Sequence, residues 1–190
     1  MKRAYLYAGL PGAGKTTAAQ VGKELTSGTY LETGDVLRDM YESSDEPDSK
    51  GLGAFAAEQR EKKGNAFATL QLIKDIIDGE REIDWPLHLS GVRHVDEVKE
   101  CREFFEDTYL FYVSAPFHVR LERLKTRARE GEGDFDAGDL LERDERELRD
   151  LGTNTIRTQG RVDERIFNYT DYEDLNEEVR FAMNNNDLRI

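Results

Sequence analysis

Gly9-Leu10-Pro11-Gly12-Ala13-Gly14-Lys15-Thr16 stands near the start of the chain and decides its fold. The stretch fits the pattern G-x-x-x-x-G-K-[ST] at every fixed position. The apolar and aromatic residues 4–8 before it are typical of a buried strand, and residues 16–25 after it contain no proline and indicate a helix. Between strand and helix, glycines let backbone N–H groups surround a polyphosphate, and the helix N-terminus adds a partial positive charge. The stretch therefore predicts a phosphate-binding loop.

An ordinary glycine-rich turn is the alternative explanation for this stretch. A turn needs one or two glycines but has no use for a Lys-Thr pair at the start of a helix. A chance match to all four fixed positions is expected in about one chain in a hundred of this length, because glycine makes up roughly 7% of average sequences. We therefore predict that Lys15 reaches the terminal phosphates of the ligand and that Thr16 offers its hydroxyl to Mg²⁺.

The composition is strongly acidic. Of the 190 residues, 40 are Asp or Glu and 27 are Lys or Arg, which gives a net charge of −13. Such a charge repels phosphate groups and argues against a general nucleic-acid binder and against an anionic membrane as a partner. Acidic excess with few lysines and 37% hydrophobic residues resembles the proteins of salt-loving organisms, whose internal salt screens the repulsion. A mesophilic acidic enzyme is the alternative.

Cysteine and histidine usage gives no sign of a disulfide or a zinc site. Cys101 is the only cysteine, which excludes an intrachain disulfide and favours a reducing compartment. The three histidines, His88, His94 and His118, have no ligand spacing. The sequence shows no signal peptide and no run of about 18 apolar residues. We expect a cytoplasmic protein and a monomer.

Predicted strands and helices alternate along the chain. Besides the first strand and helix, strands are expected at 29–32, 85–90, 109–113 and 165–168, and helices at 33–41, 54–63, 66–77, 94–105, 116–124, 139–148 and 172–183. In the helix at 66–77, Leu70, Ile73 and Ile77 repeat on one face. Residues 42–53 are expected to form a surface loop, and the charged segment from 125 a flexible arm. The alternation predicts one α/β domain over residues 1–190, with a parallel sheet and helices on both faces.

Arginines narrow the choice among proteins with a phosphate-binding loop, since GTP switches, motors and kinases all have one. No N-K-x-D guanine-reading element is present. Arginines stand at the ends of predicted strands or near the starts of helices: Arg38, Arg93, Arg123, Arg127, Arg129 and Arg143. Around one cleft they would hold a phosphorylated donor and acceptor by bidentate contacts and neutralise charge during phosphoryl transfer. The alternative is that they pair with the abundant acids on solvated faces.

These motifs together resemble the nucleoside monophosphate kinase family, adenylate kinases in particular. The resemblance rests on residues 9–17 followed by Thr33-Gly34-Asp35-Val36-Leu37-Arg38, and on Ser90-Gly91-Val92-Arg93, which is similar to the family's Asp-Gly-x-Pro-Arg element. The chain resembles still more closely an archaeal branch of these kinases related to dephospho-CoA kinases. Residues 34–36, 91–93 before Glu97-Val98, and 142–148 carry that likeness, which covers most of the chain except the loop after Glu42 and residues 152–162.

The resemblance implies a P-loop NTPase fold, a three-layer αβα sandwich with a five-stranded parallel sheet and a short arginine-rich lid at about residues 125–138. It implies ATP and Mg²⁺ as cofactors, and a small-molecule nucleotide as partner. The implied donor-binding residues are Gly12, Ala13, Gly14, Lys15, Thr16, Thr17 and Arg123. Asp35, Arg38, Arg93 and Arg143 are implied at the acceptor, with Lys15, Asp35, Arg93 and Arg127 catalytic and Thr16 and Asp35 near the metal. Lid closure would exclude water, which would otherwise hydrolyse ATP.

Ser90 departs from the family pattern, because the family has a strand-end aspartate there that helps hold Mg²⁺ through water. A serine supplies no charge, so Asp35 is expected to take over. Three functions follow from the sequence. The first is an ATP-dependent kinase of nucleoside or deoxynucleoside monophosphates. The second is a dephospho-CoA kinase-like enzyme with Asp35 as base for a hydroxyl, and the third is a nucleotide-binding regulatory protein with weak turnover.

Overall fold

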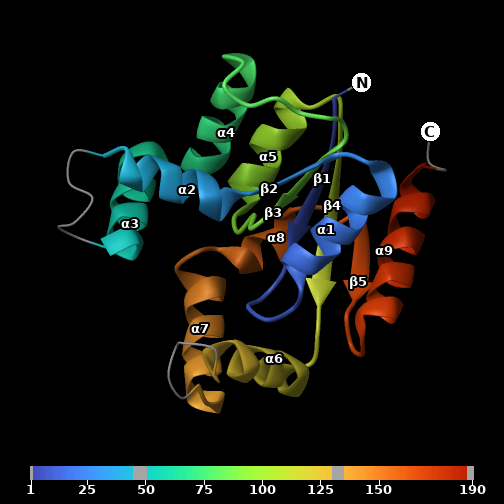
Figure 1. The fold of residues 1–190 in the computed structure, drawn as a ribbon. Coiled ribbons are helices and arrows are strands. Elements are labelled where there is room, and N and C mark those ends of the chain that lie inside the picture. The colour runs from blue at the N-terminus through green and yellow to red at the C-terminus, as the bar shows by residue number, and fades with distance from the viewer. Residues whose placement is uncertain (1, 45–50, 130–134, 188–190) are drawn as a thin grey trace.

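The computed structural model describes residues 2–44, 51–129 and 135–187. Its centre is a five-stranded parallel sheet with the strand order β2-β3-β1-β4-β5 (Figure 1). The strands are β1 (Arg3–Ala8), β2 (Thr29–Glu32), β3 (Leu87–Ser90), β4 (Asp107–Ser114) and β5 (Glu164–Phe167). Because β1 has β3 on one side and β4 on the other, the loop that follows β1 lies at the middle of the sheet's carboxyl edge. Ligands of open parallel sheets bind at this kind of position.

Helices cover both faces of the sheet, which completes the predicted αβα sandwich. One face carries α1 (Lys15–Thr26) and α9 (Tyr172–Asp187), and the other α2 (Thr33–Glu42), α4 (Phe67–Ile77), α5 (Val95–Phe104) and α8 (Thr153–Gln159). In Figure 1, α6 (Phe117–Arg129) and α7 (Ala137–Arg149) lie beyond the arrowheads of β4 and β5, and α3 (Gly51–Lys63) lies beside α2. Within the described ranges, no helix is long and apolar enough to cross a membrane.

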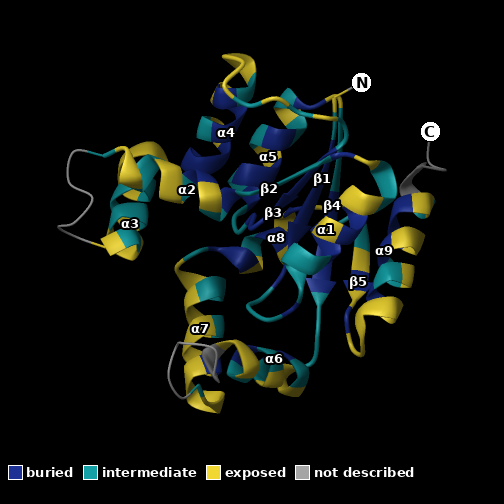
Figure 2. Cartoon of the chain, in the orientation of Figure 1, coloured by how far each residue is buried: buried dark blue, intermediate teal, exposed yellow. Residues whose placement is uncertain are grey.

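The two layers of core follow from the alternation of side chains along each strand. On β1, Leu6 faces the cluster that contains Val98 of α5, while Tyr5 and Tyr7 face the cluster that contains Val21 of α1. All five side chains are at most 1% exposed, and Figure 2 shows the central strands of the sheet as buried. The phosphate-binding loop therefore starts from a strand in the centre of the core.

The predicted face of α4 is wrong in part. Leu70 and Ile77 are 41% and 64% exposed, and the buried face carries Leu72, Ile73 and Thr69 instead. Thr69 takes an interior position because its hydroxyl donates to the buried carboxylate of Glu97 at 3.0 Å. The buried face of α4 thus includes a polar residue with a buried partner, and Leu70 and Ile77 lie on the exposed face.

The predicted flexible arm from residue 125 is also wrong in its first part, because α6 continues through Arg129. Residues 130–134 of the predicted lid lie outside the described residues. Asp136 then caps α7, accepting from the backbone N–H groups of Gly138 and Asp139. The short helix α8, at residues 153–159, has no counterpart among the predicted elements.

Candidate active site

The loop after β1 has the backbone shape of a phosphate cradle. Gly12 and Gly14 have φ of 75° and 92°, a region that side-chain-bearing residues rarely occupy, and Gly14 caps α1. A Cβ atom at Gly14 would lie 2.1 Å from Nδ2 of Asn168, and one at Gly9 would lie 2.2 Å from the backbone oxygen of Val113. Glycine is therefore required at these positions by packing as well as by backbone conformation. The N-terminus of α1 opens directly onto the loop.

Lys15 lies at the start of α1 amid several charges. Its Nζ donates to the backbone oxygen of Leu10 at 3.1 Å. Burial lowers the pKa of Lys15 to about 8, while the nearby carboxylates of Glu147 and Glu32 raise it and Arg93 lowers it. Lys15, in the loop, and Arg93, after the end of β3, are thus near enough for their charges to interact. Two neighbouring positive charges suit a phosphoryl group.

The Tyr30 hydroxyl has a carboxylate and two hydroxyls as neighbours, one of them that of the predicted metal ligand Thr16. The Tyr30 hydroxyl donates to Oε2 of Glu32 at 3.0 Å and lies 3.1 Å from Oγ of Ser90. Burial raises the pKa of Tyr30, and the neighbouring Ser90 and Thr16 hydroxyls counter this rise. Glu32 and Ser90 are direct neighbours at the ends of β2 and β3. The adjacent strand therefore places a carboxylate beside Ser90, and no sequence motif singled out Glu32.

This donor set fits Mg²⁺, which favours oxygen ligands and keeps several of its waters. Thr16 offers a hydroxyl, and Glu32 and Ser90 offer acceptors for metal-bound water. In the described part of the chain, no group of three or more His, Cys, Asp or Glu side chains is arranged to hold a metal. A magnesium ion here would thus depend on phosphate oxygens and water for most of its ligands.

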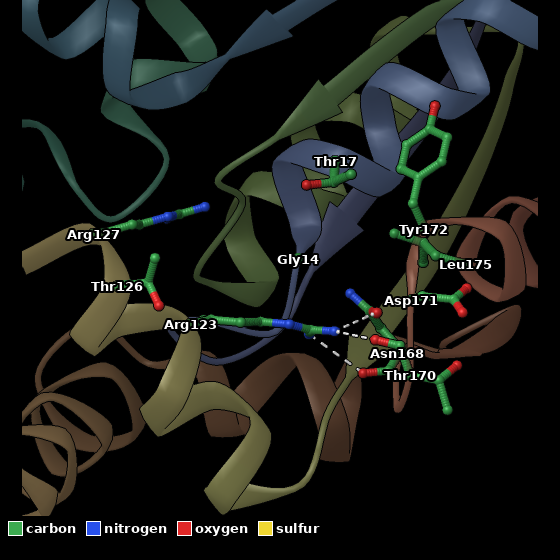
Figure 3. A pocket seen from close by; sticks show the side chains of 11 residues that line it. Gly14, Thr17, Arg123, Thr126, Arg127, Asn168, Thr170, Asp171, Tyr172 and Leu175 are labelled. Carbon is green, nitrogen blue, oxygen red and sulfur yellow. Dashed lines mark hydrogen bonds between the residues drawn. The ribbon is translucent and has the colours of Figure 1, made fainter. Parts of the chain in front are cut away.

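A cavity of about 430 Å³ adjoins the loop on the side of α6 and α9 (Figure 3). It is lined by Gly12, Gly14, Thr17, Arg123, Thr126, Arg127, Asn168, Thr170, Asp171, Tyr172 and Leu175. Arg123 donates to Oδ1 of Asn168 at 2.8 Å and to the backbone oxygen of Thr170 at 3.2 Å. Asn168, which is 4% exposed, in turn donates to the backbone oxygen of Ala13 at 2.9 Å. This cavity thus brings together the predicted donor-binding residues Thr17 and Arg123 and the predicted catalytic residue Arg127.

A second cavity, of about 630 Å³, lies on the other side of the site between α2, α3 and α7. It is lined by Glu32, Gly34, Leu37, Arg38, Leu52, Gly53, Ala56, Ala57, Arg60, Arg93, Arg146, Asp150 and Leu151. The predicted acceptor residues Arg38 and Arg93 are among them. Arg60 and Arg146 are additional, and no sequence motif singled them out.

Asp35 and Arg143 lie apart from the other predicted residues. The half-exposed Asp35 carboxylate, in the first turn of α2, pairs with Arg38. Arg143 is exposed on α7, where its guanidinium lies 4.7 Å from the ring centre of Phe135. Neither residue lines the two cavities described above. Their roles at the acceptor remain predictions.

Arg120, which the sequence analysis also missed, connects the loop with α7. This 5% exposed side chain forms a bidentate ion pair with Asp144 at 2.7 Å and donates to the backbone oxygen of Pro11 at 3.1 Å. A buried guanidinium with three satisfied bonds is a rigid link. It holds α7, and with it Glu147 and Arg146, at a set position relative to the phosphate loop.

Comparisons with known proteins agree with this geometry. The AAA domain family matches residues 8–139. A UPF0200 protein of Pyrobaculum aerophilum is 34% identical over 144 residues, 75% of this chain and 75% of the relative. The chain is an AAA-domain protein of the UPF0200 family. An adenylate kinase of Prochlorococcus marinus is 32% identical to this UPF0200 chain over 139 residues, 68% of this chain and 71% of the kinase.

Solved structures confirm the fold of this UPF0200 protein. Shikimate kinase from Acinetobacter baumannii, solved in complex with shikimate, superposes with a TM-score of 0.55 over 98% of this chain and 94% of the kinase, at 17% identity. At that identity the likeness concerns the fold alone. Family and fold are those of P-loop kinases.

Proposed function

We propose that the protein transfers the γ-phosphoryl group of ATP to the phosphate of a nucleoside or deoxynucleoside monophosphate. One observation carries the proposal: the glycine loop lines one cavity, and a second, arginine-rich cavity is lined by Arg93, whose charge acts on Lys15 of the loop. One cavity is continuous with the loop, as a donor site must be, and the other is rich in arginine, as suits an anionic acceptor. Phosphoryl transfer needs both molecules held in line with positive charge between them.

The donor would bind along the loop. Backbone N–H groups of residues 12–17 and the N-terminus of α1 would hold its phosphates, with Lys15 at the terminal ones. Arg123, fixed by Asn168, would pack beside the base or ribose, and Arg127 projects toward the same cavity from α6 (Figure 3). Mg²⁺ held near Thr16 and Glu32 would supply charge neutralisation at the β- and γ-phosphates.

The acceptor would bind in the larger cavity. Arg38 and Arg93 would contact its phosphate, and the apolar side chains of Leu37 and Leu52 would pack on its base. The proposal draws further support from the adenylate kinase of Prochlorococcus marinus among the relatives.

A hydroxyl acceptor, as in dephospho-CoA kinases, is the second candidate. It is favoured by the carboxylates of Glu32 and Glu147 close to Lys15, since a hydroxyl needs a base and a phosphate does not. The pairing of Glu147 with Arg93 at 3.5 Å counts against Glu147 as that base, because the carboxylate is already engaged by the guanidinium.

The test is ADP formation from ATP and Mg²⁺ in molar KCl, with a panel of ribo- and deoxynucleoside monophosphates and dephospho-CoA as acceptors. Lys15→Ala serves as the blank. The proposal expects ADP release that depends on one or a few monophosphates. A response to dephospho-CoA alone would establish the second candidate, and ATP binding without acceptor-dependent turnover would establish a regulatory nucleotide-binding protein.

A further inference from the structure

The four arginines of the larger cavity differ in their partners. Arg38 pairs with Asp35, and Arg93 pairs with Glu147. Among the described residues, Arg60 and Arg146 have no side-chain hydrogen bond and no carboxylate within ion-pair distance. Nε of Arg60 is, in addition, closed off from solvent without a hydrogen-bond partner. In a chain with 40 acidic and 27 basic residues, two unpaired arginines on one cavity are unexpected.

The carboxylates nearest to Arg60 are already engaged. Glu97 and Glu147 are the acids whose charge acts on Arg60 most strongly, against repulsion by Arg93 and Arg146. Glu97 is buried and accepts from the backbone N–H groups of Arg93 and His94 as well as from Thr69. Glu147 pairs with Arg93. Burial lowers the pKa of Arg60, as expected for a partly desolvated guanidinium without a close counter-ion.

The cavity as a whole is positive. Four arginines and two carboxylates, Glu32 and Asp150, line it, so the lining carries two net positive charges within a protein of net charge −13. Asp35 and Glu147, which pair with Arg38 and Arg93, lie outside this lining and offset the charge of those two arginines. Arg60 and Arg146 are therefore the guanidiniums of the cavity without a carboxylate partner.

We propose that Arg60 and Arg146 bind the anionic group of the acceptor, a compact phosphate-type dianion, and that α3 and α7 are therefore its recognition helices. This proposal rests on the proposed function for the identity of the cavity as the acceptor site. Guanidinium groups suit the task because they donate two parallel bonds to an oxyanion. A neutral acceptor would leave both guanidiniums without a partner, so the cavity selects for an anionic one.

Binding of inorganic phosphate tests the subsite without catalysis. Titration calorimetry is run in the Lys15→Ala background, which weakens phosphate binding at the loop. Arg60→Gln and Arg146→Gln are compared with Lys62→Gln and Arg149→Gln, which remove the same charge from exposed, paired positions of the same helices. We expect at least tenfold weaker phosphate binding in the first two variants and a change below twofold in the controls, because a charged hydrogen bond contributes roughly one to two powers of ten. Equal weakening of phosphate binding in all four variants, or no weakening in any of them, would refute the proposed subsite.

Kinetics give the second readout and separate this inference from the proposed function. With an active monophosphate, Arg60→Gln should raise the acceptor KM at least tenfold and leave the KM of ATP within twofold. The acceptor KM of Arg60→Lys should lie between those of Arg60→Gln and wild type. If monophosphates react but Arg60→Gln leaves the acceptor KM unchanged, the subsite is refuted while the function stands. If phosphate binding behaves as expected but wild type phosphorylates no monophosphate, the function fails while the subsite stands.

Discussion

Gly14→Ala is the sharpest test of the phosphate loop. The substitution forces a side chain into a left-handed conformation, which costs about 1–2 kcal/mol. Its Cβ would also displace the buried amide of Asn168, which lies 2.1 Å away. That amide bonds the Ala13 carbonyl and the charged Arg123, and losing the two bonds costs about 2.5–4 kcal/mol. We expect the free energy of unfolding, measured in urea, to fall by about 4–6 kcal/mol, with loss of ATP binding.

Two further variants separate these contributions. Gly79 has a similar φ of 74° with no atom within 4 Å of an added Cβ, so Gly79→Ala should cost only the backbone strain, about 1–2 kcal/mol. In an Asn168→Ala background the clash is absent, and Gly14→Ala should again cost only about 1–2 kcal/mol. If Gly14→Ala in the wild-type background costs no more than Gly79→Ala, the contact with Asn168 contributes nothing and the reasoning is refuted.

Three further predictions concern single side chains. Burial lowers the pKa of His88 from 6.5 to about 4, so its neutral form stabilises the fold above pH 6.5 and this contribution is lost as pH falls toward 4. Between about pH 7.5 and 5, the free energy of unfolding measured in urea should fall by about 2 kcal/mol more in wild type than in His88→Gln. An equal fall in both proteins would contradict this prediction. Glu32→Gln should raise the Mg²⁺ concentration for half-maximal ADP formation about tenfold, because it removes the negative charge beside Ser90, whereas an unchanged magnesium titration would remove Glu32 from the proposed metal site. Arg123→Gln should raise the KM of ATP about tenfold and leave the acceptor KM unchanged, and the reverse pattern would move Arg123 to the acceptor.

The fold was largely predictable because its signals are local. Each strand is a short apolar run bounded by a turn, and the glycine loop identifies β1 and α1 directly. The errors arise where tertiary contacts override local pattern. Thr69 is buried through Glu97 while Leu70 is exposed, and α6 extends through a highly charged segment to Arg129. Charge along a helix gives no sign of where it ends.

The candidate site was predictable only where a motif exists. The loop residues and Arg93 stand in recognisable patterns. Asn168 and Arg60 stand in none, because only the folding of the chain brings Asn168 to the loop and Arg60 to the larger cavity. Glu32 shows the same limit. Its pairing with Ser90 depends on the register of β2 against β3, which a single sequence does not reveal.

Transfer of an isotopically labelled γ-phosphoryl group tests the central claim most directly. ATP labelled in the γ-phosphoryl oxygens is incubated with the protein, Mg²⁺ and each monophosphate, and the products are identified by mass spectrometry. The account predicts that the label appears in a nucleoside diphosphate, in a one-to-one ratio with ADP, and that Lys15→Ala abolishes it. Label that appears only in inorganic phosphate or on a hydroxyl acceptor would contradict the account.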